Sequence, residues 1–326
     1  MSTVVQDQGR RIAGKYELVE PVGEGGMASV WKGLTHGAAG FTRTVAIKRV
    51  LPSLSGDTKF AALFVEEARV VSDLQHPNIV QIHDFDQDEL GSYFIVMEWV
   101  EGIDLARYVR SYNRVGDTTP WPYVAAVGIE VLRALTHAHE RITAEGELAP
   151  VIHRDVTPSN ILLGTNGIVK LADFGLARAM DRVSMTKPGT VKGKLAYMAP
   201  EVMHGQKASN RSDIYCLGIC LFESLTGRRL FTGTSDLDLV MKVREGKIPD
   251  LGALRTDLPS SLVEIVNCAL AKEPVDRFES AREMQRAIAA VLRTHPEPTD
   301  AEPLGRSVRL AIEQLPSSAM RPPDSP

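Results

Sequence analysis

The chain has 326 residues and a mass of 35.6 kDa, which is enough for about two domains or one large bilobal unit. Apolar residues make up 44% and charged residues 24% of the chain, a mixture that excludes disordered and fibrous proteins for most of its length. Lysine and arginine total 37 against 41 acidic residues, and this net charge of −4 argues against a nucleic-acid-binding protein that depends on phosphate contacts.

The three cysteines, Cys216, Cys220 and Cys268, are too few and too scattered for a disulfide framework or a zinc site, and fit a reducing compartment. Cys216 and Cys220 lie four residues apart in an apolar stretch and are predicted to be small core residues on one helix face. The longest apolar run, 214–222, is far short of the ~20 residues that span a bilayer. Residues 1–15 lack the apolar core of a signal peptide, so we expect a cytoplasmic protein without a membrane segment.

The N-terminal part of the chain has the pattern of an antiparallel sheet. After residues 1–15, which are polar and expected to be flexible, short runs alternate apolar with polar residues and are separated by glycine, as in β-hairpins. One helix is predicted among them at about 57–74, where apolar residues recur at spacings of three and four. The predicted strands lie at 16–25, 27–34, 41–50, 79–85 and 92–100.

Helical patterns dominate after Gly102. A small β-rich part followed by a larger helical part predicts an α+β protein of two lobes joined by a hinge. The predicted limits are 16–98 for the first lobe, 98–102 for the hinge and 103–294 for the second lobe. Within the second lobe, helices are predicted at about 122–142, 212–227, 260–271 and 280–293.

The last residues, 295–326, hold seven of the 19 prolines and are predicted to be a linker or tail. A frayed tail is the simpler expectation. The alternative is one short amphipathic helix docked on the folded domain, because apolar residues recur there at helical intervals. These residues are Leu304, Val308, Leu310, Ile312 and Leu315.

A glycine-rich segment, 23–30, lies between the first two predicted strands. Glycines let a backbone approach phosphates without a Cβ clash, so that its amides face the negative charge. A glycine-rich hairpin turn is the alternative interpretation. Ala28 stands where a third glycine would complete the phosphate-binding pattern.

Lys48 comes late in the predicted strand 41–50, where a lysine is costly to bury unless an anion meets it. Glu67 is the candidate partner, because it shares the apolar stripe of the helix at 57–74. Its neighbour Glu66 is predicted to face water. The alternative for Lys48 is an edge lysine whose ammonium reaches solvent.

Three further motifs follow in order along the chain. A His-Arg-Asp tripeptide ends at Asp155 and is followed by Asn160, and a carboxylate and an amide five residues apart on a rigid loop suit a general base and a metal ligand. Asp173 begins Asp-Phe-Gly after the strand-like run 168–172, where a Mg²⁺-binding carboxylate would sit. A Met-Ala-Pro-Glu motif ends at Glu201. A single such motif arises readily by chance, but all of them in this order and spacing do not.

With these motifs the chain resembles the eukaryotic-like Ser/Thr protein kinase family, and most of all its bacterial members, over residues 16–294. The resemblance implies a bilobal protein-kinase-like fold, with a small antiparallel β-sheet N-lobe that carries one main helix and a larger, mostly helical C-lobe. It also implies ATP and Mg²⁺ as cofactors, with Mn²⁺ as an alternative cation. The implied reaction transfers the γ-phosphate of MgATP to Ser or Thr hydroxyls of protein substrates.

Position by position, the resemblance implies catalytic roles. Lys48 would hold the α- and β-phosphates and pair with Glu67. Asp155 would accept or orient the proton of the substrate hydroxyl, while Asn160 and Asp173 would bind Mg²⁺.

The resemblance also implies a nucleotide pocket made by the glycine-rich loop, the adenine-lining side chains and the hinge. Glu98 and Val100 would contribute backbone hydrogen bonds, and Asp104 would meet the ribose. The implied residues are Val22, Gly23, Glu24, Gly25, Gly26, Val30, Ala46, Lys48, Met97, Glu98, Val100, Asp104 and Leu162.

Three features outside this pocket follow from the same resemblance. Asp213 is similar to the helix aspartate that anchors the catalytic loop. Glu201 would form a structural ion pair with Arg277. The segment 140–151 is longer than family members usually need and is predicted to be a surface loop insertion.

Two positions depart from the family pattern. Thr157 stands two residues after Asp155, where Ser/Thr members usually carry a lysine that contacts the γ-phosphate. Lys194 stands seven residues before Glu201, where such members usually carry a threonine. Because the replacements are reciprocal, our hypothesis is that Lys194 brings its ammonium to the γ-phosphate while Thr157 supplies the hydroxyl. The alternative is a solvated Lys194 in a slower enzyme.

The acceptor residue is predicted to be Ser or Thr, because Pro158 and Tyr197 fit Ser/Thr kinases better than tyrosine kinases, although Lys194 weakens this prediction. By the same resemblance, Arg154 would meet a phosphate on the activation segment, 173–201, and the kinase would be activated by autophosphorylation. The alternative is that the hydroxyl residues of this segment are ordinary polar loop residues. The candidate phosphosites, in order of preference, are Thr190, Thr186 and Ser184.

Protein substrates are the expected partners, together with self-association for trans-autophosphorylation. A pseudokinase is one alternative, favoured by Thr157 and opposed by the filled catalytic positions. A small-molecule kinase is another, opposed by the Glu201 motif with Arg277 and by the long activation segment.

Overall fold

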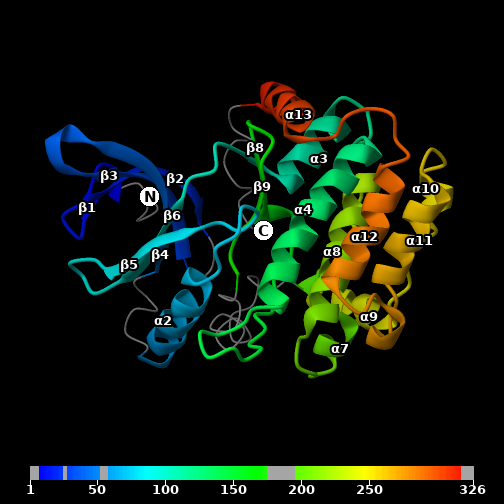
Figure 1. Cartoon of the computed structure of the whole chain (residues 1–326), viewed down its shortest axis with the longest axis horizontal. Coiled ribbons are helices and arrows are strands. Elements are labelled where there is room, and N and C mark those ends of the chain that lie inside the picture. The colour runs from blue at the N-terminus through cyan, green and yellow to red at the C-terminus, as the bar shows by residue number, and fades with distance from the viewer. Residues whose placement is uncertain (1–6, 25–27, 52–57, 175–194, 317–326) are drawn as a thin grey trace.

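The computed structural model describes residues 7–24, 28–51, 58–174 and 195–316 of the chain. Figure 1 shows a sheet with helix α2 (Thr58–Ser72) on one side of the molecule and a larger group of helices on the other. This arrangement is the predicted α+β architecture of two lobes.

A six-stranded antiparallel sheet forms the N-lobe, in the order β1-β2-β3-β4-β6-β5. Irregularities in the β2–β3 register occur between Leu18 and Glu20 and between Pro21 and Gly23, just before the glycine-rich loop. The strands are β1 (Arg11–Ile12), β2 (Tyr16–Glu24), β3 (Ala28–His36), β4 (Thr42–Val50), β5 (Ile82–Gln87) and β6 (Tyr93–Glu98).

Strand β4 is buried on both faces from Val45 to Val50, and this explains the position of Lys48. Because successive side chains of a strand point to opposite faces, Ala46, Lys48 and Val50 share one face. Ala46 and Val50 pack with residues of α2 and β6, whereas Val45 and Ile47 pack against the other side of the sheet with Trp31. Lys48 is therefore held on the same face as Ala46, with only 5% of its surface exposed.

The expectation of a flexible N-terminus is wrong for residues 7–15. Ile12 of β1 is fully buried, and β1 pairs with β2 through Arg11 and Ile12. Asp7 also forms an ion pair of 2.6 Å with the buried Arg49. A two-residue strand with one apolar side chain is too short for its periodicity to be visible in the sequence.

The C-lobe is built around α4 and α8, which pack against each other and against α12. Almost every residue of α8 is buried, including Cys216 and Cys220, as predicted for these two cysteines. The helices are α3 (Leu105–Arg114), α4 (Trp121–His139), α7 (Pro200–Met203), α8 (Asn210–Thr226), α9 (Asp236–Glu245), α10 (Leu251–Leu254), α11 (Ser260–Ala269), α12 (Ala281–Leu292) and α13 (Ala301–Gln314).

A small three-stranded sheet lies where the lobes meet. It consists of β7 (Gly102–Asp104), β8 (Ile161–Gly164) and β9 (Val169–Leu171), in that order. Leu171 is joined to the segment after α2: its amide donates to the Asn78 carbonyl at 2.8 Å, and its carbonyl accepts from the Val80 amide at 3.0 Å. The two lobes are thereby linked through backbone hydrogen bonds.

The segment 140–151 forms a small hairpin, in which Ile142 bridges to Leu148 and both side chains are largely exposed. This agrees with the predicted surface insertion. The frayed tail expected after residue 294 is wrong for 301–315: the amphipathic alternative forms α13, whose Leu304 and Val308 are buried. Burial against the C-lobe supplies the stabilisation that a lone short helix lacks.

Among the residues that the structure describes, no helix is both long and apolar enough to cross a membrane.

Candidate active site

The loop that contains Asp155 is anchored to α8 by hydrogen bonds to Asp213. Asp213 is fully buried near the start of α8, and its carboxylate accepts the backbone N–H groups of His153 and Arg154, each at 2.8 Å. A third donor is the Nε2 atom of His139, also at 2.8 Å. Burial by itself raises the pKa of Asp213, but hydrogen bonding to His139 and the loop amides outweighs it and lowers the pKa. The predicted anchoring role of Asp213 is confirmed.

Arg154 occupies the left-handed region, with φ of 68°. For a residue with a side chain this conformation is uncommon and costs about 1–3 kcal/mol, so it persists only where neighbours enforce it. The hydrogen bond from its amide to Asp213 is one such restraint. The backbone immediately before Asp155 is therefore held by Asp213.

The imidazole ring of His153 stabilises the same loop. It is fully buried, its Nε2 atom lies 2.9 Å from the Ala172 carbonyl, and its Nδ1 atom accepts the Asp155 amide at 3.2 Å. One donor and one acceptor require a neutral ring, and burial lowers the pKa of His153. The ring also meets Phe174 edge to face, with centroids 4.4 Å apart. His153 thus joins the Asp155 loop to the segment around Asp173.

Asn160 restrains Asp155 directly. Its Nδ2 atom donates to the Asp155 carbonyl at 2.8 Å and to a carboxylate oxygen of Asp155 at 3.2 Å. The backbone carbonyl of Asn160 accepts a hydrogen bond from the Ala172 amide at 2.8 Å. Thr157, two residues after Asp155, is nearly buried, and its hydroxyl lies 3.0 Å from that of Ser159.

Lys48 and Asp173 form an ion pair of 2.7 Å between the lobes. Asp173 is itself left-handed, with φ of 61°, an unusual conformation in which aspartate is enriched. A buried ion pair is a weak source of stability, because desolvation offsets most of the attraction. A lysine and an aspartate held in this way are therefore better explained by a ligand that uses both.

Asn160 and Asp173 have the chemistry of ligands for a hard cation, which prefers amide and carboxylate oxygens. The amide nitrogen of Asn160 is bound to Asp155, so its side-chain oxygen remains as the acceptor. Among the described residues, no group of three or more His, Cys, Asp and Glu side chains could hold a metal by itself.

Three of the four side chains predicted to line the adenine, Ala46, Met97 and Leu162, meet in one cluster, whereas Val30 is half-buried in β3. Ala46 and Met97 are buried together there, and Val100 and Leu162 pack against them. Leu162 is paired across β7 and β8 with Asp104, the predicted ribose contact. The structure thus brings residues from 46 to 162 to one place.

Asp104 caps the start of α3, where its carboxylate accepts the Arg107 amide at 2.8 Å and lies 3.3 Å from Arg107 Nε. Burial raises the pKa of Asp104, opposed by this amide and by the charges of Arg107 and Arg110. The position of Asp104 is therefore tied to that of α3.

Glu98, for which the sequence predicts backbone hydrogen bonds, also forms side-chain contacts. Its amide donates to the Gln81 carbonyl at 2.9 Å, so a nucleotide contact at Glu98 would fall to its own carbonyl oxygen. Its carboxylate accepts the Gln81 amide at 2.8 Å and Lys170 Nζ at 2.5 Å. Lys170 belongs to β9, so this ion pair joins the end of the N-lobe sheet to the small sheet between the lobes.

The segment 195–201 is fastened to α8 at two points. The Tyr197 hydroxyl donates to Glu223 at 2.6 Å. Glu201 accepts the Ser212 hydroxyl at 2.8 Å and two guanidinium nitrogens of Arg277 at 2.8 and 2.9 Å. The predicted ion pair of Glu201 with Arg277 is confirmed.

Several predicted residues lie outside what the structure describes. The position of Gly23 is described, paired with Val30 in the sheet, as is the Val22 that precedes it. The side chains of Glu24 and Glu67 are not described, so the Lys48–Glu67 pair stays a prediction, whereas Glu66 is exposed as expected. The predictions that fall outside entirely concern Gly25, Gly26, Ser184, Thr186, Thr190 and Lys194.

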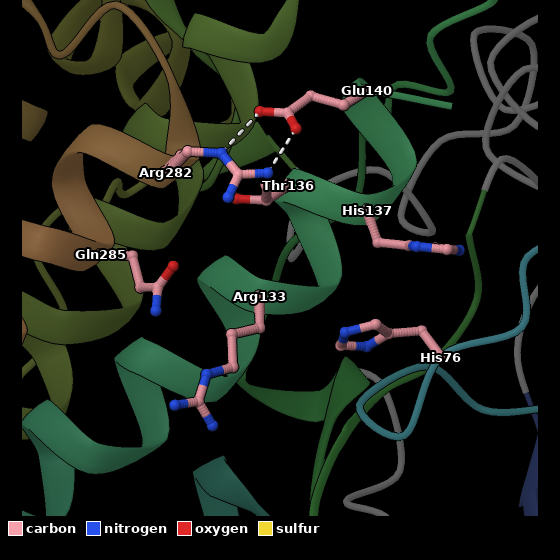
Figure 2. A pocket seen from close by; sticks show the side chains of 7 residues that line it. All are labelled: His76, Arg133, Thr136, His137, Glu140, Arg282 and Gln285. Carbon is pink, nitrogen blue, oxygen red and sulfur yellow. Dashed lines mark hydrogen bonds and ion pairs between the residues drawn. The ribbon is translucent and has the colours of Figure 1, made fainter. Parts of the chain in front are cut away.

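Two pockets lie in different parts of the C-lobe. One of about 40 Å³ opens beside Asp155 and is lined by Tyr197 and Met198 of the segment 195–201 and by Val202 of α7. A larger one, of about 320 Å³, lies between α4, α12 and the segment after α2 (Figure 2). No predicted site residue lines the larger pocket, and Figure 2 shows its Arg282 already paired with Glu140. It is separate from the site around Asp155.

Residues 16–288 match the family model described as the protein kinase domain. The chain belongs to the eukaryotic-like Ser/Thr protein kinase family. It is 36% identical over 282 residues to serine/threonine-protein kinase PrkC of Bacillus subtilis, covering 86% of this chain and 41% of that protein. With serine/threonine-protein kinase PknA of Mycobacterium tuberculosis it shares 34% identity over 311 residues, 93% of this chain and 68% of PknA.

Another relative carries a different name. The kinase is 40% identical over 292 residues to tyrosine-protein kinase MasK of Myxococcus xanthus, covering 90% of this chain and 45% of MasK. The chain therefore spans less than half the length of MasK and of PrkC. Among solved structures, the kinase domain of Mycobacterium tuberculosis PknI is similar with a TM-score of 0.64 and 30% identity, covering 87% of this chain and 97% of that one. This similarity confirms the predicted kinase fold.

The sequence did not reveal several partners that position the kinase site. His139, the last residue of α4, carries no motif, but its side chain is buried against Asp213 of α8. Glu223 and Lys170 likewise lack a local signal, because each acts through a partner far away in sequence. Their contacts with distant residues, rather than any motif, identify them.

Breaking the Glu201–Arg277 pair should be costly. We predict that Arg277→Ala lowers the free energy of unfolding by about 3–5 kcal/mol at pH 7, because the buried carboxylate of Glu201 loses its cation. Arg282→Ala is the matched control, since it breaks an exposed pair with Glu140 and should cost no more than about 1 kcal/mol. Denaturant unfolding measures both.

The Glu201–Arg277 pair also makes the free energy of unfolding depend on pH. Burial raises the pKa of Glu201, but hydrogen bonds from Arg277 and Ser212 outweigh it, so the folded-state pKa lies below the usual 4.5. The stabilisation is then complete above pH 4.5 and is lost as the pH falls through the folded-state pKa. The difference between wild type and Arg277→Ala should shrink in this acidic range, and a constant difference would contradict the assignment.

Proposed function

We propose that the chain is an active protein kinase that transfers the γ-phosphate of MgATP to Ser or Thr hydroxyls of proteins. The observation that carries the proposal is the 2.7 Å pair of Lys48 and Asp173, held next to the Asp155 loop by His153. One restrained group of residues thereby supplies the three groups that the reaction needs: Lys48 as a cation for the phosphates, Asp173 as a metal ligand and Asp155 as the acceptor of the hydroxyl proton.

In this proposal the adenine lies between Ala46, Met97 and Leu162, and the ribose meets Asp104. Lys48 binds the α- and β-phosphates. Asn160 and Asp173 hold Mg²⁺, which neutralises phosphate charge when bound.

Asp155 orients the acceptor hydroxyl. The hydroxyl oxygen forms the new bond to the γ-phosphorus, the bond from that phosphorus to the bridging oxygen breaks, and ADP leaves with the electron pair. The hydroxyl proton passes to Asp155 and then to solvent. The hydrogen bonds of Asp155 with Asn160 and His153 keep its carboxylate positioned for this step.

The names of the relatives support both classes of acceptor. PrkC and PknA are named serine/threonine-protein kinases, whereas MasK is named a tyrosine-protein kinase. We favour Ser and Thr because Pro158 and Tyr197 fit Ser/Thr kinases better than tyrosine kinases, and Tyr197 lines the small pocket beside Asp155.

We further propose activation by autophosphorylation at Thr190, with Thr186 and Ser184 as secondary sites. Arg154 would bind the resulting phosphate, and two self-associated copies would act on one another in trans. Protein substrates are the partners that fit this reaction. The need for ATP and the three free cysteines favour the cytoplasm as the place of action.

The first test is transfer of radiolabelled γ-phosphate from MgATP to the kinase itself and to a general protein substrate. Asp155→Asn should lower kcat by about 10²–10⁴-fold, since it removes the group that accepts the proton. Asp117→Asn, at an exposed position, is the matched control and should retain full activity.

Analysis of the labelled amino acids and sites completes this test. We expect phosphoserine and phosphothreonine, with Thr190 labelled in the active enzyme. Phosphotyrosine alone would replace the Ser/Thr proposal by tyrosine specificity. Nucleotide binding without any transfer would make the chain a pseudokinase.

A second test concerns the reciprocal positions. If the Lys194 ammonium stabilises the γ-phosphate, Lys194→Ala should lower kcat at least about tenfold. The exposed Lys207 provides the control, and Lys207→Ala should leave kcat unchanged.

The double exchange of Thr157 and Lys194 extends this comparison. Thr157→Lys combined with Lys194→Thr should recover part of the activity lost in Lys194→Ala, because the charge near the phosphate is restored. A kcat for Lys194→Ala within about twofold of wild type would end the hypothesis.

A further inference from the structure

Helix α13 lies beyond residues 16–288, which match the kinase family, yet it is part of the folded C-lobe. Figure 1 shows α13 next to α3 and to the end of β8, and it packs against α3, β7 and β8. Leu304 and Val308 belong to the same buried cluster as Ile103 of β7 and Leu163 of β8. The helix therefore covers the elements that carry Asp104 and Leu162.

A polar contact fixes the register of α13 on α3. The Ser307 hydroxyl lies 2.6 Å from that of Tyr108 and 2.9 Å from that of Tyr112. Tyr108 is fully buried, and burial raises its pKa, so its hydroxyl remains a neutral group that needs a partner. Leaving a buried hydroxyl without its partner is unfavourable, which favours this one position of the helix.

Backbone contact fixes α13 on the turn after β8. A Cβ added at Gly305 would lie 2.8 Å from both the Gly167 nitrogen and the Thr165 carbonyl oxygen, closer than real Cβ atoms come. Arg309 also donates to the Thr165 carbonyl. The Thr165 amide in turn donates to the Glu101 carbonyl at 2.8 Å, just before β7. Only glycine at 305 permits this approach.

Asp104 is connected to both parts of the C-lobe that α13 contacts, α3 and strand β8. It ends β7, where it pairs with Leu162 of β8, and its carboxylate caps α3. Displacing α3 or the paired strands β7 and β8 would therefore displace Asp104.

We propose that α13 positions the ribose edge of the nucleotide site, with Gly305 and Ser307 as positioning residues that act through the hairpin turn and Tyr108. This inference rests on the proposed binding of ATP at Asp104. Docking of α13 and binding of the nucleotide are then coupled, and the coupling is reciprocal. A segment outside the kinase family match thus contributes to nucleotide affinity.

The test compares Gly305→Val with Arg306→Val in the full chain. The first valine meets the hairpin backbone, whereas the second has the same side chain at the neighbouring exposed position of α13. The dissociation constant for ADP with Mg²⁺, measured by calorimetry, should rise at least about fivefold in Gly305→Val and stay unchanged in Arg306→Val. The kcat at saturating ATP should stay within about twofold of wild type, because the Asp155 loop is untouched.

Hydrogen exchange of the amides at 304–312 gives a second readout that does not depend on transfer. In wild type, MgADP should slow their exchange, and Gly305→Val should make it fast. If Gly305→Val does not fold, Ser307→Ala carries the same comparison with a smaller loss of affinity, because it removes only the hydroxyl contacts to Tyr108 and Tyr112.

The outcomes separate the two proposals. A wild-type chain that binds no MgADP would overturn the proposed function, and this inference with it. A variant that releases α13 but binds MgADP as tightly as wild type would overturn the inference alone. Protection of 304–312 that survives both substitutions would also overturn it, because the described contacts would not hold the helix.

Discussion

A single buried carboxylate organises the active site of this kinase. Asp213 is fully buried and charged, which is tolerable only because its oxygens accept two backbone amides and a histidine nitrogen. Those amides belong to His153 and Arg154, so satisfying the charge also fixes the left-handed turn before Asp155. His153 extends the restraint to the residues around Asp173. The hydrogen bonds that stabilise the charge of Asp213 therefore also position the site. Helix α8 in addition anchors the segment 195–201 through Glu223 and Ser212.

The N-lobe contributes to the site through the alternation of β4. One face of this strand carries Ala46 and Lys48 toward the site, and the other carries Ile47 into the outer core. The buried Lys48 is matched by Asp173 rather than by solvent. Since such a pair adds little stability, its presence fits the phosphates and metal that we propose it serves. Nucleotide binding would then draw on restraints from both lobes, and from α13 through Asp104.

Much of this organisation could be predicted from the sequence, because the local patterns were strong. The strands of the N-lobe and the long helices follow apolar periodicity, and the motifs at Asp155 and Asp173 have characteristic neighbours and spacing. Other parts depend on distant partners that no local pattern reveals. The stripe of α13 was visible, but its burial depends on Tyr108, about 200 residues away. Ile12 lies in a strand too short to show alternation, and His139 has no motif. The roles of Glu67, Lys194 and Thr190 stay predictions, because they lie outside the described side chains.

The most direct test of this account is the turnover of Asp213→Asn. The substitution keeps the shape of the side chain but replaces an acceptor oxygen by a donor facing backbone N–H groups, so the loop should lose its fixed position. We predict that kcat for phosphate transfer falls about a hundredfold while the chain stays folded and binds MgADP as wild type does. Asp236→Asn, an exposed first-turn aspartate of α9, should change neither. A folded Asp213→Asn variant with wild-type kcat would contradict the central claim that this carboxylate positions Asp155.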